Sequence, residues 1–139
     1  MNPIHILLVE DNEGDVLLTT VALEEAAIDF ALSVVNDGKE AINFLNKEGK
    51  YAGANQPELI FLDINLPKKN GHEVLKYIKE NENFKHIPVI ILSTSSSQKD
   101  IDMAYVNNAN GFITKPSDVK EFLTAVVSTV NAWMPKVKK

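Results

Sequence analysis

Short apolar runs alternate along the chain with longer amphipathic stretches. There are five such runs, and three of them are almost continuously apolar, as expected for strands that are covered on both faces. The runs are IHILLV (4–9), ALSVV (31–35), LIFL (59–62), VIIL (89–92) and GFIT (111–114). The pattern therefore predicts five short strands.

The stretches between these runs carry helical periodicity. The clearest is the last, where one apolar stripe recurs at helical spacing. Its members are Val119, Phe122, Leu123, Val126, Val127 and Val130. Further helices are predicted over 14–27, over 38–48, after Gly71 (Val74, Leu75, Ile78) and, more weakly, over 98–108, where Ile101, Ala104 and Tyr105 form the apolar face.

Strand and helix alternate five times, which predicts an α/β fold with a single doubly wound parallel sheet and helices on both faces. Right-handed crossovers limit the topology, and for five strands they favour the flavodoxin-like order 2-1-3-4-5. The length of 139 residues and the hydrophobic share of 45% suit one domain with a sizeable core. Residues 47–57 form the one long connection.

Composition excludes several classes of protein. The chain has no cysteine, which fits a reducing compartment and excludes thiolate metal sites. The first apolar run is too short for a signal peptide, and no run approaches the roughly 20 residues needed to cross a bilayer. The net charge of −5 argues against a nucleic-acid surface, so Lys68-Lys69 and the tail KVKK are interpreted as solvated surface. We expect a cytoplasmic protein with no nucleic-acid or membrane partner.

Polar residues follow four of the predicted strands. An ionised acid such as Asp63, at the end of a buried strand, costs free energy unless something compensates it. In parallel sheets, ligands bind beyond the carboxyl ends of the strands, near the point where the strand order reverses. The residues expected to meet there are Glu10, Asp11, Asp63, Ser93, Thr94 and Lys115, the last followed by Pro116.

Each of these residues also fits a simpler structural role. Acids after strands often cap helices, and either Asp11 or Asn12 is suited to cap the first helix. Taken together, clustered carboxylates raise each other's pKa unless a cation is present, and a hard oxygen site of this kind suits Mg²⁺. Asp63 is then able to attack a phosphorus atom while Mg²⁺ and Lys115 neutralise charge on the phosphoryl oxygens. The hydroxyl of Ser93 is a further donor to those oxygens.

In this order and at this spacing, the residues resemble the receiver domains of bacterial two-component response regulators, of the CheY type. The resemblance covers nearly the whole chain. It implies that Asp63 accepts a phosphoryl group and that Lys115 pairs first with Asp63 and then with that group. It also implies that Ser93 shifts to bond a phosphoryl oxygen. The implied Mg²⁺ ligands are Glu10, Asp11, Asp63 and the backbone carbonyl of Asn65.

The resemblance carries further implications for signalling. Phe112 takes the place of the family's switch aromatic, although the role of a plain strand core residue fits it equally well. Phosphorylation is expected to repack Phe112 and Thr94 and to shift the face formed by the fourth helix, fifth strand and fifth helix. The protein would be a signalling domain rather than an enzyme. Residues 1–139 would form one receiver domain, with a core of about 4–132, a short tail at 133–139 and no output domain.

The long loop at 47–57, the segment NLPKKNG and Trp133 are similar to features of small single-domain regulators paired with bacterial phytochromes. That narrower resemblance implies a phytochrome-like sensor histidine kinase, or a phosphotransfer protein, as partner. It also implies a homodimer through the fourth and fifth helices. Two departures stand out, since Glu10 replaces the commoner Asp and Phe112 lacks the hydroxyl of the commoner Tyr.

Two other functions compete. A phosphatase of the haloacid dehalogenase type also uses a strand-end Asp, but it needs a second Asp two residues later as general acid, and here that residue is Asn65. A flavin-binding module is suggested by STSSS (93–97), but Glu10 and Asp11 would repel a phosphate. No G-x-S-x-G motif surrounds these serines. His5, His72 and His86 lack metal-ligand spacing and are interpreted as structural or surface residues.

Overall fold

The computed structural model describes residues 3–26, 28–66, 70–94, 97–115 and 118–133. Lys68, Lys69, Pro116 and the tail from 134 onward lie outside the described residues. The strands are β1 (Ile4–Val9), β2 (Phe30–Val35), β3 (Leu59–Asp63), β4 (Val89–Ser93) and β5 (Gly111–Thr114). The helices are α1 (Glu13–Glu25), α2 (Gly38–Leu45), the short 3-10 helix η1 (Gly49–Tyr51), α3 (Gly71–Glu80), α4 (Gln98–Val106) and α5 (Val119–Trp133).

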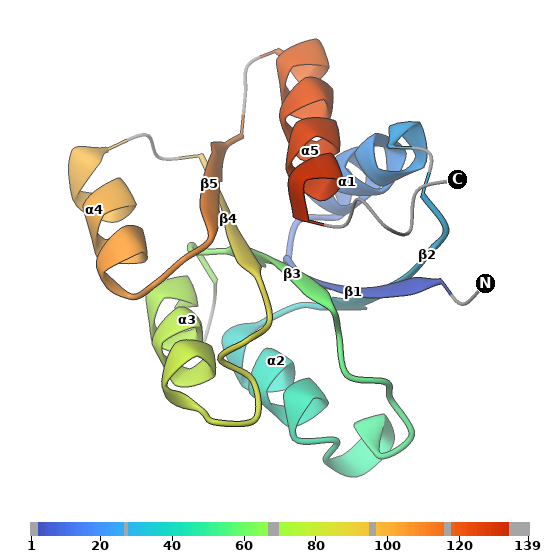
Figure 1. Cartoon of the computed structure of the whole chain (residues 1–139), viewed down its shortest axis with the longest axis vertical. Helices are drawn as coiled ribbons and strands as arrows, with labels where there is room; N and C mark the ends of the chain where they lie inside the picture. Colours follow the sequence, from blue (N-terminus) through green and yellow to red (C-terminus); the bar gives the residue numbers. More distant parts are fainter. Residues whose placement is uncertain (1–2, 27, 67–69, 95–96, 116–117, 134–139) are drawn as a thin grey trace.

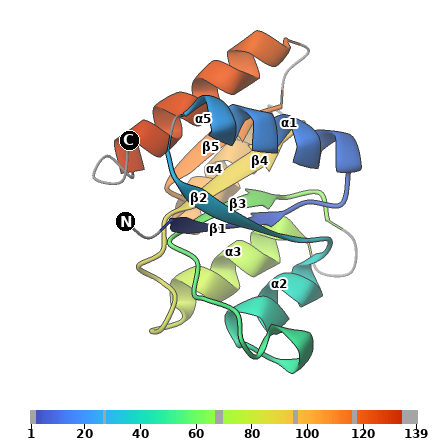
Figure 2. The same ribbon diagram turned by 90° about the vertical axis from the view of Figure 1, so that its right-hand side faces the viewer.

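The five strands form one parallel sheet in the order β2-β1-β3-β4-β5, which confirms the predicted fold class and strand order. Helices α1 and α5 pack side by side on one face, and α2, α3 and α4 cover the other (Figures 1 and 2). Alternate residues of each central strand therefore enter opposite cores. Leu7 and Val9 face the α2–α4 side, while Ile6 and Leu8 face α1 and α5. Burial on both faces explains the continuous apolar runs.

Several helix boundaries differ from the sequence prediction, and α1 runs over Glu13–Glu25 rather than 14–27. Helix α2 ends at Leu45 rather than at residue 48, because Lys47 has a left-handed backbone (φ 56°) and the Glu48 N–H turns back to the carbonyl of Asn43 at 2.9 Å. Helix α4 ends at Val106 rather than 108, and Asn108 (φ 70°) is left-handed. Helix α5 continues to Trp133, so this residue belongs to the helix rather than to the tail.

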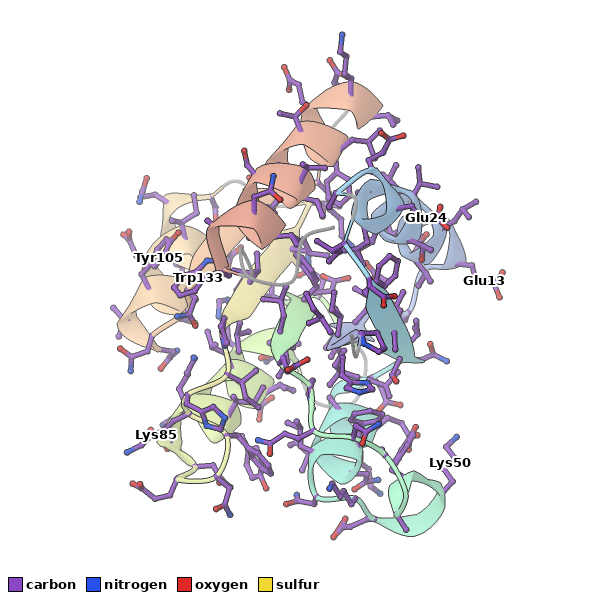
Figure 3. All side chains as sticks on the ribbon, turned by 45° about the vertical axis from the view of Figure 1, so that its right-hand side comes forward. Glu13, Glu24, Lys50, Lys85, Tyr105 and Trp133 are labelled. Carbon is purple, nitrogen blue, oxygen red and sulfur yellow. The ribbon has the colours of Figure 1, made fainter. Side chains whose placement is uncertain are left out.

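Helix α4 is the least embedded of the α-helices that the structure describes. It buries Ala104, whereas Tyr105 and Val106 are exposed, Val106 by 78%. Tyr105 on α4 and Trp133 at the end of α5 are both labelled on the surface in Figure 3. Within the described ranges, no helix has both the length and the apolar character of a membrane span.

Candidate functional site

The carboxyl ends of β1, β3, β4 and β5 meet at one edge of the sheet. Asp63 lies opposite Leu92 in the pairing of β3 with β4, and Ser93 lies opposite Thr114 in the pairing of β4 with β5. This register places Ser93 level with Thr114, the residue before Lys115, and Asp63 one residue earlier, level with Leu92. Both side chains are buried, as is Glu10 after β1. The edge therefore collects the buried polar residues that the sequence predicted there.

Lys115 brings a positive charge to the carboxyl-terminal edge of the sheet. Its ammonium donates to Oε1 of Glu10, to Oδ2 of Asp63 at 3.1 Å and to Oδ2 of Asp15 at 3.0 Å, while its side chain is only 8% exposed. Its backbone N–H donates to the carbonyl of Ser93 at 2.6 Å. Burial alone would lower the pKa of Lys115. The hydrogen bond to Glu10 and the charge of Asp63 outweigh burial, so the pKa is raised and the amine stays charged.

Asp63 is a buried carboxylate with a partner for each oxygen. Oδ1 accepts the backbone N–H of Asn65 at 2.9 Å, and Oδ2 accepts the Lys115 ammonium. These bonds compensate the cost of an ionised acid at a buried strand end. The bond from Asn65 also fixes the backbone immediately after the acid, where the resemblance predicts a carbonyl ligand.

Glu10 is fully buried between Asp63 and Lys115. Burial and the neighbouring Asp63 raise the pKa of Glu10 to about 7, although the hydrogen bond and charge of Lys115 act to lower it. Its Oε2 accepts the backbone N–H of Asp11 at 3.2 Å. Oxygen atoms of Glu10, Asp11 and Asp63 lie within 4.8 Å of one another, with Asp11 exposed. Three carboxylates converge here beside a single ammonium group, so the site has an excess of negative charge. Such a group of oxygen ligands is suited to bind a hard divalent cation.

Asp15 is a member of the cluster that the sequence prediction missed. It lies in the first turn of α1, where its backbone N–H donates to the Asn12 side chain at 2.9 Å, so Asn12 rather than Asp11 caps the helix. This cap orients the first turn and brings the Asp15 carboxylate to Lys115. In the sequence Asp15 is an ordinary acid in the first turn of a helix, so the pattern of residues gave no separate signal for it.

The remaining candidate residues lie around this centre. Ser93 is fully buried, and Thr94 is exposed. Phe112 is partly buried on β5, opposite Ile91, and packs against the core on the α2–α4 side of the sheet. The histidines do not converge: His5 is on β1, His86 precedes β4, and Nε2 of His72 lies 3.4 Å from an Asp100 oxygen on α4.

Gly71 closes the loop after Asp63. A Cβ built on Gly71 would lie 2.3 Å from Cα of Ile64 and 2.5 Å from the carbonyl oxygen of Asp63, so no larger residue fits without backbone movement. The Gly71 N–H donates to the carbonyl of Ile64 at 3.0 Å. The missing side chain thus lets α3 begin directly against the end of β3.

Replacing Gly71 with Ala should destabilise the protein by about 1–3 kcal/mol, since the new methyl group overlaps backbone atoms that cannot rotate away. Urea denaturation measures this loss. Gly53→Ala is the matched control, because a Cβ at Gly53 meets no described atom within 4 Å. Equal stability of the two variants would show that the loop next to Asp63 relaxes without cost.

Comparisons with known proteins agree with this geometry. The family of the response regulator receiver domain matches residues 6–127. The response regulator Rcp1 of Synechocystis sp. is 39% identical over 97% of this chain and 92% of its own length. The phosphorylated cyanobacterial phytochrome response regulator RcpA superposes with a TM-score of 0.90 at 41% identity, over 96% of this chain and 95% of its own. The Mn²⁺-bound form of Rcp1 superposes with a TM-score of 0.89 at 39% identity, over 98% of each chain.

Proposed function

Because this chain belongs to the response regulator receiver family, we propose that it accepts one phosphoryl group on Asp63 and signals through protein contacts. Receiver domains of two-component systems are signalling domains rather than ordinary enzymes. One observation carries the assignment of the acceptor: the buried carboxylate of Asp63 accepts a hydrogen bond from the Lys115 ammonium and lies beside the acids Glu10 and Asp11. RcpA, which is similar over nearly its whole length, is described in its phosphorylated form.

In the proposed reaction, an Asp63 oxygen attacks the phosphorus atom of the donor. A new P–O bond forms while the bond from phosphorus to the leaving group breaks, and the leaving group takes the electron pair. Lys115 donates hydrogen bonds to the phosphoryl oxygens, and Ser93 supplies a hydroxyl donor from the neighbouring strand. Bound Mg²⁺ would add charge neutralisation at those oxygens.

The residues that would hold the metal are Glu10, Asp11, Asp63 and the backbone carbonyl of Asn65. Their donors are hard oxygens, as Mg²⁺ prefers. Rcp1 is described in a Mn²⁺-bound form, which supports a divalent metal site in this chain. Glu10 is the longest of the three acids, and we propose that it would contact the metal through a water molecule rather than directly.

Glu10→Gln should weaken binding of Mg²⁺ or Mn²⁺ by about tenfold to a hundredfold, because an acid that orients a metal-bound water is lost. Titration calorimetry of the purified variant measures the affinity. Glu13→Gln is the charge-matched control, since Glu13 projects away from the protein in the first turn of α1 (Figure 3). Equal metal affinity of wild type and Glu10→Gln would remove Glu10 from the proposed site.

The phosphatase alternative predicts a different time course. With Asn65 two residues after the nucleophile, no carboxylic acid stands there to protonate a leaving group. A receiver should therefore take up one phosphoryl group from acetyl phosphate and then stop. Steady release of phosphate from simple phosphate esters by the natural protein would contradict the proposal, and Asn65→Asp is not expected to create such turnover.

We propose a cytoplasmic sensor histidine kinase, or a phosphotransfer protein, as the phosphoryl donor in the cell. The likeness to RcpA, a cyanobacterial phytochrome response regulator, supports a phytochrome-like kinase. The face formed by α4, β5 and α5 is the proposed output surface and homodimer contact. Helices α4 and α5 carry the exposed apolar side chains of Tyr105, Val106, Val119 and Trp133.

Phosphorylation should change amide hydrogen exchange in α4, because this helix buries little and a loosely packed helix is easier to move. We expect Ser93, Thr94 and Phe112 to transmit the change. Exchange measured by mass spectrometry, with and without acetyl phosphate, checks this prediction. An unchanged exchange pattern over 98–106 in a fully phosphorylated sample would rule out the proposed route.

A further inference from the structure

Lys115 uses all of its hydrogen-bonding capacity within the site. An ammonium group has three N–H donors and no acceptor, and three carboxylates receive them. The acceptors are Glu10, Asp15 and Asp63, the last two at 3.0 and 3.1 Å. A phosphoryl oxygen that needs a hydrogen bond from Lys115 must therefore displace one of these three acids.

Two features of Asp15 indicate that it is the acid that a phosphoryl oxygen would displace from Lys115. Its side chain is 32% exposed, against 0% for Glu10 and 6% for Asp63, so water can replace Lys115 as its partner. Glu10 and Asp63 belong to the group of three acids whose oxygens are close enough to share a metal ion. Among the described residues, Asp15 is not a member of that group. Asp63 itself would carry the phosphoryl group.

We propose that Asp15 is a positioning residue that holds the Lys115 ammonium in the resting state and competes with the phosphoryl group for it. This inference rests on the proposed acceptance of a phosphoryl group at Asp63. Asp15 keeps Lys115 beside Asp63 before transfer. After transfer, Asp15 competes with the phosphoryl oxygens for the N–H donors of Lys115. This competition weakens the hydrogen bonds between Lys115 and the phosphoryl oxygens.

A purely structural role for Asp15 predicts something else. An acid in the first turn of a helix interacts favourably with the helix dipole, and that effect needs no contact with Lys115. Glu13 has the same charge in the same turn and projects away from the protein (Figure 3). Glu13→Gln therefore reproduces the change in net charge and in helix dipole without touching Lys115.

The test uses trifluoroberyllate, an anion that adds to a carboxylate and imitates a phosphoryl group, in the presence of Mg²⁺. Its affinity is measured by titration for wild type, Asp15→Asn, Asp15→Ala and Glu13→Gln. We expect both Asp15 variants to bind it at least about threefold more tightly than wild type, as for the loss of a partly exposed charge partner. Glu13→Gln should remain at the wild-type affinity.

A second readout reports on Lys115 directly. In NMR spectra of the resting wild type, the ammonium protons of Lys115 should exchange slowly with water, and Asp15→Asn should speed that exchange. Affinity and exchange equal to wild type in both Asp15 variants would leave Asp15 a purely structural role and overturn the proposal. Weaker binding of trifluoroberyllate by either variant would overturn it too, since Asp15 would then assist the anion rather than compete with it.

Failure of this inference is distinguishable from failure of the proposed function. Asp63→Asn should abolish trifluoroberyllate binding, because the anion needs the carboxylate. If wild type binds in an Asp63-dependent manner and the Asp15 variants behave like wild type, only the role of Asp15 is wrong. If wild type fails to bind, or Asp63→Asn still binds, the acceptor assignment itself is wrong.

Discussion

Replacing Lys115 with Met is expected to destabilise the metal-free protein by about 3–5 kcal/mol, the cost of leaving a buried ion pair without one partner. The side chain of Lys115 is 8% exposed, and Glu10 and Asp63 beside it are almost fully buried. Met retains the length and apolar stem of Lys but not its charge. Without the ammonium, neighbouring carboxylates must take up protons or remain uncompensated.

Saturating Mg²⁺ should recover part of this stability, because the cation supplies charge that the variant has lost. Urea denaturation with Mg²⁺ and with EDTA measures both effects. Lys120→Met is the control, since Lys120 is an exposed lysine on α5 and its loss should change stability by less than about 0.5 kcal/mol. A Lys115→Met variant that unfolds at the wild-type urea concentration without metal would contradict the electrostatic description of the site.

The fold was predictable because its central strands are covered on both faces. Continuous apolar runs such as LIFL and VIIL are too short to form buried helices, so they indicate strands that are buried on both faces. The helices of the same chain are recognised separately, because their apolar residues recur at helical spacing. Parallel pairing and right-handed crossovers then leave few strand orders, and the predicted order is the one observed. The same topology predicted that Glu10, Asp63 and Lys115 would meet, since each follows or ends a strand at one edge.

What the sequence did not predict depends on local geometry. Asp15 has the sequence context of an ordinary acid in the first turn of a helix, and only the position of α1 relative to β5 brings it to Lys115. The early end of α2 depends on a left-handed Lys47, a residue without a strong preference for that conformation. The need for glycine at position 71 follows from the approach of α3 to the carbonyl of Asp63.

The second large effect is expected for Asp63→Asn, which should lose phosphoryl acceptance completely. An amide oxygen is a far weaker nucleophile than a carboxylate, and an amide cannot form the acyl phosphate. Asn is close to Asp in size, and its Oδ1 still accepts the Asn65 N–H, while Lys115 keeps Glu10 and Asp15 as acceptors. The variant should therefore fold, and its circular dichroism and urea midpoint provide the control.

Intact mass after incubation with Mg²⁺ and acetyl phosphate tests the central claim most directly. Wild type should gain the mass of a single phosphoryl group, EDTA should prevent the gain, and Asp63→Asn should show none under either condition. A gain of the same mass in folded Asp63→Asn, or a gain in wild type that persists in EDTA, would contradict the assignment of Asp63 as a metal-assisted phosphoryl acceptor.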